Sequence, residues 1–138
     1  MKVAVPRERA PGERRVALTP DAVAALVKGG TEVLVEAGAG DAAFHPDAAF
    51  EQAGARIATD AGALYGAADV VLKVQKPAPP EVEQLREGSV LVAFLQALTS
   101  PDLIRSLVAR RITSFGMPKT PNTAMPSARR PGGVRSAA

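Results

Sequence analysis

The chain of 138 residues contains no cysteine, no tryptophan and only one histidine, His45. Without cysteine it has no disulfide, no thiol nucleophile and no cysteine metal site, and a single histidine excludes every metal site that requires two. No Ser-His-Asp set can be assembled, and few groups remain for proton transfer near neutral pH. We therefore predict no metal site and no catalytic residue, and we expect His45 to lie in a loop at the surface.

Aromatic residues and long apolar runs are also scarce. Aromatic residues make up 4% of the chain, so alanine, valine and leucine must build most of the core from the 46% of residues that are hydrophobic. No apolar run approaches the ~20 residues of a membrane-spanning helix, and the first residues are typical of a strand rather than a signal sequence. We expect a cytoplasmic protein that does not insert directly into a membrane.

The positive net charge of +3 has a local origin. Residues 118–138 hold Lys119, Arg129, Arg130 and Arg135 and no acidic residue, so the rest of the chain carries 13 basic and 14 acidic residues, a net charge of −1. A nucleic-acid-binding surface would cluster its basic residues on the folded domain and support them with stacking aromatics. We therefore predict no nucleic-acid partner.

Short apolar runs alternate with helix start signals along the chain. Thr19-Pro20-Asp21 and Ser100-Pro101-Asp102 each combine a hydroxyl N-cap with proline and an acid in the first turn. Strands that alternate with helices at this spacing predict an α/β fold, a doubly wound, mostly parallel, flavodoxin-like sheet in a single domain. The predicted strands are residues 3–5, 31–36, 55–58, 69–74, 90–95 and 112–115, and the predicted helices start near residues 20, 46, 60, 81 and 101.

The pattern ends near Met117. Residues 118–138 contain four prolines, two glycines and no apolar periodicity. Such a segment cannot bury enough apolar surface to offset the entropy lost on ordering. We predict a folded domain at residues 1–117 and a basic, Pro/Gly-rich, disordered tail at residues 118–138.

Residues 38–43 (GAGDAA) match the pattern G-x-G-x-x-A and follow a predicted strand. In a dinucleotide-binding fingerprint, the second glycine would precede a helix whose N-terminus receives the pyrophosphate. Here the helix start signal, Pro46-Asp47, comes several residues later, and no acid closes a following strand at the right distance. A glycine-rich turn is therefore the favoured interpretation.

Four polar side chains lie at or beyond the carboxyl ends of predicted strands, where open α/β sheets place ligand sites. These candidate rim residues are Arg15, Lys73, Gln75 and Gln96. Arg15 could clamp a carboxylate or phosphate through two parallel hydrogen bonds, or could belong to a solvated charge run paired with Glu8 and Glu13. Lys73 could hold an anion or be an exposed edge residue, whereas the two glutamines can hydrogen-bond an amide or a ribose but cannot transfer a proton.

Several segments, in order, resemble one known family. They are MKVAVPRE at residues 1–8, PGERRVALTPD at 11–21, VEAGAG at 35–40, AGA at 53–55 and ADVVLKVQKP at 68–77. Over residues 1–117 the chain is similar to the N-terminal domain shared by alanine dehydrogenases and the alpha subunits of nicotinamide nucleotide (NAD(P)) transhydrogenases. Because several motifs occur in the same order, the resemblance is specific.

Two rim positions distinguish the two branches of this family, the alanine dehydrogenases and the transhydrogenases. Alanine dehydrogenases have a catalytic lysine at the position of Gln75 and a catalytic histidine at the position of Gln96, and amide side chains have no proton to transfer near neutral pH. The transhydrogenase branch has glutamine in the first motif and no histidine in the second. The resemblance therefore implies a transhydrogenase. Arg15 matches the arginine that binds the substrate carboxylate in alanine dehydrogenases, and we interpret its presence as shared ancestry.

The resemblance implies that the whole protein is the NAD(H)-binding, peripheral part of a proton-translocating transhydrogenase, an oxidoreductase that passes a hydride from NADH to NADP+. NAD(H) would be the cofactor of the complete subunit. The implied partners are a Rossmann domain later in the polypeptide and membrane transhydrogenase subunits, and the implied location is cytoplasmic, peripheral to the inner membrane.

The resemblance weakens after Met117. There the family has a segment like ELMPRxxRAQSMD, whose polar residues contact the nicotinamide, and residues 118–138 do not match it. We expect the chain alone to be truncated and inactive, to bind no cofactor, and to be a monomer or a weak homodimer. Two alternatives remain open: a stand-alone small-ligand or interaction module that uses the rim, and a fragment of an alanine dehydrogenase.

Overall fold

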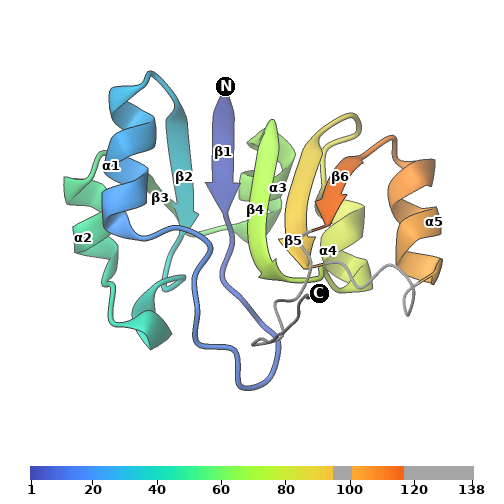
Figure 1. The fold of residues 1–138 in the computed structure, drawn as a ribbon, viewed down its shortest axis with the longest axis horizontal. Helices are drawn as coiled ribbons and strands as arrows, with labels where there is room; N and C mark the ends of the chain where they lie inside the picture. Colours follow the sequence, from blue (N-terminus) through green and yellow to red (C-terminus); the bar gives the residue numbers. More distant parts are fainter. Residues whose placement is uncertain (95–100, 117–138) are drawn as a thin grey trace, which may run out of the picture.

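The computed structural model describes residues 1–94 and 101–116 of the chain. Six strands of this described part form one sheet, in the order β3-β2-β1-β4-β5-β6, and every pair of neighbouring strands is parallel. Figure 1 shows their carboxyl ends at one edge of the sheet, with the loop that follows β1 below that edge. The strands are β1 (Lys2–Val5), β2 (Glu32–Glu36), β3 (Arg56–Ala58), β4 (Val70–Gln75), β5 (Val90–Phe94) and β6 (Thr113–Gly116).

Helices lie on both faces of the sheet. In the view of Figure 1, α1 stands in front of the sheet beside β2, whereas α3 and α4 lie behind it. One apolar cluster, which includes Val23 and Phe50, packs on the α1 face, and a second, which includes Tyr65 and Leu91, packs on the opposite face. The predicted doubly wound α/β sheet is therefore confirmed. The helices are α1 (Pro20–Lys28), α2 (Asp47–Gln52), α3 (Ala61–Ala67), α4 (Pro79–Gln84) and α5 (Pro101–Ala109), with a 3-10 helix, η1 (Asp41–Ala43).

The strand order places β1 beside β4 at the centre of the sheet. From β1 the chain winds outward to β3, crosses back to β4, and then winds in the opposite direction to β6. This is the six-stranded doubly wound order 3-2-1-4-5-6, rather than the five-stranded flavodoxin order 2-1-3-4-5. In both orders, ligands bind outside the carboxyl ends of the strands, where the direction of winding reverses. Here that position lies between β1 and β4.

The first helix follows its predicted signals. Thr19 Oγ1 accepts a hydrogen bond from the N–H of Ala22 at 3.2 Å, and Pro20 occupies the first turn. After the helix, Gly30 has a φ of +95°, a conformation that side chains with a Cβ rarely adopt. Because β1 ends at Val5 and α1 begins only at Pro20, a long loop, residues 6–19, connects them at the carboxyl edge of the sheet.

The glycine-rich segment after β2 is a packed turn. A Cβ on Gly40 would lie 2.5 Å from the carbonyl oxygen of His45 and 2.6 Å from Cε2 of Phe50, so only glycine fits there. The N–H of Gly38 donates to Asp47 Oδ1 at 2.9 Å, which joins the turn to α2. His45, predicted at the surface, is half-buried because this turn places its ring edge-on to Phe50. The structure favours a structural turn over a dinucleotide fingerprint.

Helix α4 begins at Pro79, two residues before its predicted start. Pro79 and Pro80 fit the first helical turn, where no intrahelical N–H is required. Glu81 Oε1 accepts the N–H of Ala78 at 2.8 Å and completes this helix start. Pro79 and Pro80, which precede the predicted start of this helix, therefore form its first turn.

Four predictions lie outside the described residues. They are the N-cap Ser100, the rim residue Gln96, the domain end at Met117 and the disordered tail at residues 118–138. Within the described ranges, no helix has both the length and the apolar character needed to cross a bilayer.

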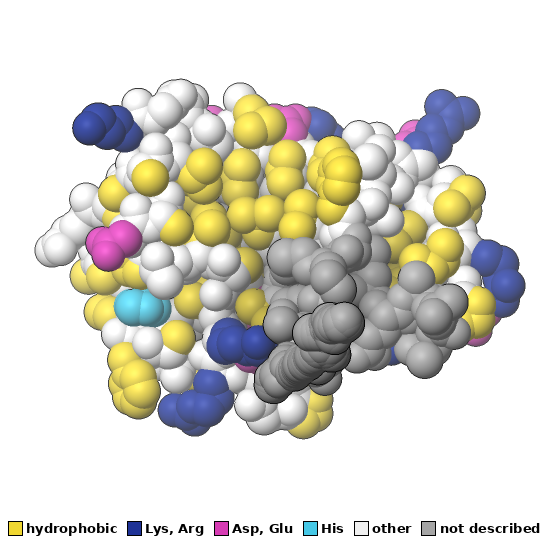
Figure 2. All heavy atoms as spheres, viewed as in Figure 1, with side chains coloured by type: hydrophobic (Ala, Val, Ile, Leu, Met, Phe, Trp, Pro, Cys, Tyr) yellow, Lys and Arg dark blue, Asp and Glu magenta, His cyan; other side chains and the backbone are white. Residues whose placement is uncertain are grey.

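The front of β4, β5 and β6 has no helix over it among the residues that the structure describes (Figure 1). The strand registers pair Leu72 with Val92 and Val92 with Phe115, so these three side chains share one face. Phe115 is 59% exposed, and Figure 2 shows an area of hydrophobic side chains over the front of the sheet. This apolar face borders the carboxyl edge at which loop 6–19 lies.

Candidate functional site

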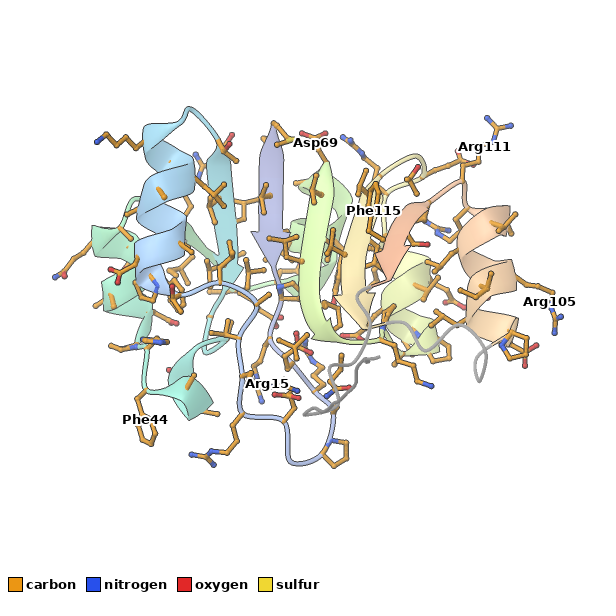
Figure 3. All side chains as sticks on the ribbon, viewed as in Figure 1. Arg15, Phe44, Asp69, Arg105, Arg111 and Phe115 are labelled. Carbon is orange, nitrogen blue, oxygen red and sulfur yellow. The ribbon has the colours of Figure 1, made fainter. Side chains whose placement is uncertain are left out.

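Loop 6–19 folds back onto the end of β4. There two of the predicted rim residues, Arg15 and Gln75, are hydrogen-bonded to the same carboxylate, that of Glu13. Arg15 Nε and Nη2 each donate to the Glu13 carboxylate at 2.9 Å, and the N–H of Arg15 donates to Glu13 Oε2 at 2.8 Å. Gln75 Nε2 donates to Glu13 Oε1 at 2.6 Å. Figure 3 shows Arg15 below the carboxyl edge of the sheet. Glu13 is therefore the centre of the contact between the loop and β4.

The electrostatics of Glu13 follow from these contacts. The hydrogen bonds from Arg15 lower the pKa of Glu13 to about 2; burial opposes this effect, and the amide of Gln75 adds to it. Glu13 is thus ionised at neutral pH, and an ionised carboxylate only accepts hydrogen bonds. The Arg15 side chain is 62% exposed, and within the described ranges its Nη1 donates to no protein acceptor.

Lys73 lies inside the protein, although one of the two interpretations of the sequence placed it at an exposed edge. Its Nζ donates to Glu8 Oε1 at 3.2 Å and lies 3.6 Å from Glu81 Oε2, and the three side chains are 1%, 2% and 12% exposed. Glu8 also accepts the N–H groups of Val74 at 2.7 Å and Gln75 at 3.2 Å. Lys73 does hold anions, but they are internal carboxylates.

The burial of Lys73 has a cause in the strand. The register between β4 and β5 shifts between Leu72 and Gln75, so the strict alternation of inward and outward side chains is broken. Lys73 comes two residues after the buried Val71 and therefore shares its face of the sheet, where Tyr65 packs. Val74, at the shift, is buried next to it. The carboxylate of Glu8 then satisfies the two backbone N–H groups at the irregular end of the strand.

Two further polar contacts surround this network. The hydroxyl of Tyr65 donates to Glu81 Oε2 at 3.1 Å, and burial together with the charge of Glu81 raises the pKa of Tyr65, which stays protonated. Glu36, at the end of β2, accepts hydrogen bonds from Arg9 Nη1 at 3.1 Å and from the N–H of Arg7 at 2.8 Å. Burial opposes ionisation of Glu36, but these contacts outweigh it and lower its pKa. Carboxylate contacts therefore join loop 6–19 to the ends of both β2 and β4.

Two pockets meet at Arg15. The first, of about 280 Å³, has mainly apolar walls and is lined by Arg15, Val16, Ala17, Leu72, Lys73, Val74 and Val92. The second, of about 310 Å³, has a more polar lining of Arg7, Glu8, Glu13, Arg15, Gly38, Ala39, Asp41 and Ala42. Among the described side chains, no group of three or more His, Cys, Asp or Glu is arranged to hold a metal ion. The edge between β1 and β4 thus offers space for an organic ligand.

The structure brings three of the four predicted rim residues together. Arg15 and Gln75 share the carboxylate of Glu13, and Lys73 lies behind them in the buried network, while Gln96 lies outside the described residues. The charge-run interpretation paired Arg15 with Glu8 and Glu13; among the described residues Arg15 forms its ion pair with Glu13, and Glu8 forms an ion pair with Lys73 instead. No sequence pattern indicated that Glu13 would pair with Arg15 and Glu8 with Lys73.

Comparison with known proteins gives the chain's relationship. The family model described as "Alanine dehydrogenase/PNT, N-terminal domain" matches residues 4–128. The chain belongs to this family. The match extends past Met117, the predicted end of the domain, and the position of that end remains a prediction.

Members of both branches of the alanine dehydrogenase/PNT family are similar to this chain. An NAD(P) transhydrogenase subunit alpha protein of Rhodospirillum rubrum is 45% identical over 126 residues, which cover 88% of this chain and 33% of that protein. Alanine dehydrogenase of Mycobacterium tuberculosis (strain CDC 1551 / Oshkosh) is 38% identical over 128 residues, which cover 91% of this chain and 34% of that protein. The crystal structure of transhydrogenase from Sinorhizobium meliloti superposes with a TM-score of 0.80 at 34% identity and covers 88% of this chain and 37% of that structure.

The resemblance to the N-terminal domain of transhydrogenase alpha subunits is therefore confirmed. The chain spans about a third of the length of the Rhodospirillum and Mycobacterium relatives. Its likeness to them covers the N-terminal domain of the family, and these relatives are named as a subunit of an NAD(P) transhydrogenase and as an alanine dehydrogenase, both oxidoreductases.

Proposed function

We propose that this chain is the N-terminal part of the NAD(H)-binding alpha subunit of a proton-translocating NAD(P) transhydrogenase, which passes a hydride from NADH to NADP+. The observation that carries the proposal is Gln75, held at the end of β4 with its amide 2.6 Å from Glu13. Reduction of an imine to an amino acid needs a group that transfers a proton, and an amide has none to give near neutral pH. Hydride transfer between two nicotinamides needs no such group from the protein.

The first pocket fits one end of a nicotinamide cofactor. Leu72, Val74 and Val92 supply apolar walls for a flat ring, and Arg15 at the border supplies hydrogen-bond donors for a polar substituent. The rest of a dinucleotide would contact protein beyond this pocket. NADH, when bound, supplies the hydride; the residues of this chain would orient the ring, exclude water from one of its faces and hold its substituent.

The decisive experiment compares two activities of the complete alpha subunit assembled with its membrane subunits. We expect reduction of an NADP+ analogue at the expense of NADH, and no alanine-dependent reduction of NAD+. Alanine-dependent reduction without transfer between the nucleotides would refute the proposal and would favour the alanine dehydrogenase branch. The 138-residue chain is expected to bind NADH weakly or not at all in calorimetry, and micromolar binding would contradict this assignment of the nucleotide contacts.

The location, partners and domain limits follow from the same proposal. We propose a cytoplasmic domain, peripheral to the inner membrane, whose partners are a Rossmann domain and membrane subunits, with NAD(H) as cofactor of the complete subunit. We also propose that the folded domain ends near Met117 and that residues 118–138 form a disordered tail. Limited proteolysis tests this limit, because a resistant core that extends past residue 125 would contradict it.

A stand-alone ligand-binding module is the second candidate. It is favoured by one observation: two pockets of about 280 and 310 Å³ share Arg15, whose side chain is largely exposed. Thermal denaturation in the presence of small carboxylates discriminates the two candidates. A dose-dependent rise in Tm with a carboxylate, absent in Arg15→Ala, would favour the module.

A further inference from the structure

The front of β4, β5 and β6 carries apolar side chains that belong to neither of the two apolar clusters. Val71 of β4 and Leu91 of β5 point behind the sheet, where they pack in the cluster of Tyr65. Their neighbours in the same strands point to the front, yet none of these is part of the cluster that α1 and α2 form there. We call these residues the apolar front face: Val70, Leu72, Val90, Val92 and, on β6, Phe115.

The direction in which the chain winds explains why this face has no helix. A connection between parallel strands of one sheet is almost always right-handed, so the direction of winding decides which face its helix covers. Helices α1 and α2 lie in connections that lead from β1 towards β3, and they pack in front. Helices α3, α4 and α5 lie in connections that lead the opposite way, towards β6, and they pack behind (Figure 1). Among the described elements, no connection leads back from β6 across the front.

The composition of these strands requires a cover on both faces. Parallel sheets are found almost only where helices cover both faces, and their strands are then apolar on both sides. The runs VVLKV at residues 70–74 and VLVAF at 90–94 have this character. Figure 2 shows the hydrophobic area that results over the front of the sheet, and Phe115 within the apolar front face is 59% exposed.

The sequence limits where such a cover can come from. Residues 118–138 contain four prolines, two glycines and no apolar periodicity, so they lack the pattern of an amphipathic helix. The polypeptides of the relatives are much longer, since the match spans only 33% of the Rhodospirillum protein. A helix that follows residue 138 in a longer polypeptide therefore suits the face better than the tail does.

We propose that in the complete polypeptide an amphipathic helix from beyond residue 138 packs on the apolar front face. Its apolar stripe covers the five side chains of that face. It also borders the first pocket, because Leu72 and Val92 line both the face and the pocket. The proposal rests on the proposed function only for the statement that the chain is the N-terminal part of a longer subunit.

The lack of cysteine makes this face accessible to thiol labelling, since one introduced cysteine reports on its own position alone. Phe115→Cys and Val92→Cys are made in the 138-residue chain and in a complete alpha subunit freed of other cysteines. The rate of reaction with a maleimide is then measured in each protein. We expect the thiol at position 115 to react at least about tenfold more slowly in the complete subunit, because a covered thiol reacts only when its contact opens. The thiol at position 92 should change in the same direction.

Val108→Cys is the matched control. Val108 is also an exposed apolar residue, at 71%, but it lies on α5, which packs behind the sheet. Its rate of labelling should be the same in both proteins. Equal rates at position 115 in the two proteins, or an equal fall at position 108, would overturn the proposal. So would slow labelling at position 115 in the 138-residue chain alone, because the tail or a second copy would then cover the face.

A photoreactive group attached to the thiol at position 115 identifies the covering segment in the complete subunit. Mass spectrometry of the cross-linked peptides should find a segment beyond residue 138 with apolar residues at the i, i+3, i+4, i+7 spacing of a helix. Cross-links to residues 118–138, to a second copy or to a membrane subunit would contradict the proposal. Neither measurement uses transfer between NADH and an NADP+ analogue, so a failure here is distinguishable from a failure of the proposed function.

Discussion

Replacement of Lys73 by methionine removes the cation from the buried network and keeps most of the length of the side chain. In the wild type, Lys73 Nζ lies between the carboxylates of Glu8 and Glu81, and all three groups are almost fully shielded from water. The variant leaves two negative charges near one another without their shared counter-charge. The change therefore tests whether the network stabilises the carboxyl edge of the sheet.

The expected loss follows from what remains around Glu8. Breaking a buried ion pair by removing one partner typically costs about 3–5 kcal/mol. Glu8 keeps the N–H groups of Val74 and Gln75, so we expect the lower end of that range, about 3 kcal/mol. Because a domain of this kind has about 5–15 kcal/mol of total stability, this loss is a large fraction of it. It corresponds to a fall in Tm of roughly 10–20 °C.

Urea denaturation followed by far-UV circular dichroism measures this loss. Lys28→Met is the control, because Lys28 is an exposed residue in the last turn of α1 and should cost less than about 1 kcal/mol. Adding Glu8→Gln to Lys73→Met should restore about 1–2 kcal/mol, since it removes one uncompensated charge. A loss in Lys73→Met no larger than in Lys28→Met, or no recovery in the double variant, would refute the reasoning.

Four further substitutions have measurable outcomes. Gly40→Ala should lower the free energy of unfolding by about 2–3 kcal/mol, because the added Cβ would meet backbone and ring atoms. Gly66→Ala, where a Cβ would meet nothing within 4 Å, should raise the free energy of unfolding by about 0.5–1 kcal/mol. Similar effects at both sites would contradict the packing argument. The pKa of Glu13, about 2, lies below its unfolded value of about 4.3, so Glu13 stabilises the fold above the unfolded pKa and this contribution disappears as the pH falls through about 2. The stability difference between wild type and Glu13→Gln should therefore be about 1–2 kcal/mol near neutral pH, reduced by the exposure of Arg15, and should vanish in strong acid; a difference independent of pH would contradict it. Thr19→Ala should cost about 1 kcal/mol in thermal or urea denaturation, because α1 loses its N-cap, and an unchanged Tm would contradict this.

Local sequence signals predicted most of the elements. The Thr19 cap, the proline after it and the glycines that end α1 act within a few residues of one another, so their effect can be inferred without tertiary structure. The apolar runs predicted the strands for the same reason. The early start of α4 was missed because the prediction began this helix at Glu81, although prolines are well suited to a first helical turn.

The contacts of the rim could not be predicted in the same way. Sequence placed Arg15, Lys73 and Gln75 at the carboxyl edge, because strand ends are local features. It did not show that Glu13 would join Arg15 to Gln75, since these residues meet only when loop 6–19 folds back on β4. The burial of Lys73 follows from the strand alternation that puts it on the face of Val71, but its ion pairs depend on Glu8 and Glu81, which come from a distant loop and helix and are not indicated by the strand sequence.

The contact between Glu8 and Lys73 also sets an order of events in folding. The two residues are separated by 65 positions, and the strands that carry them to each other, β1 and β4, are neighbours in space but not in sequence. Contacts of such long sequence separation form after local ones, because the chain must first lose the entropy of a long loop. During synthesis, Glu8 thus emerges well before its three donors. We therefore expect the carboxyl edge to become ordered only once β1 and β4 have paired, so that an ordered rim indicates a formed sheet centre.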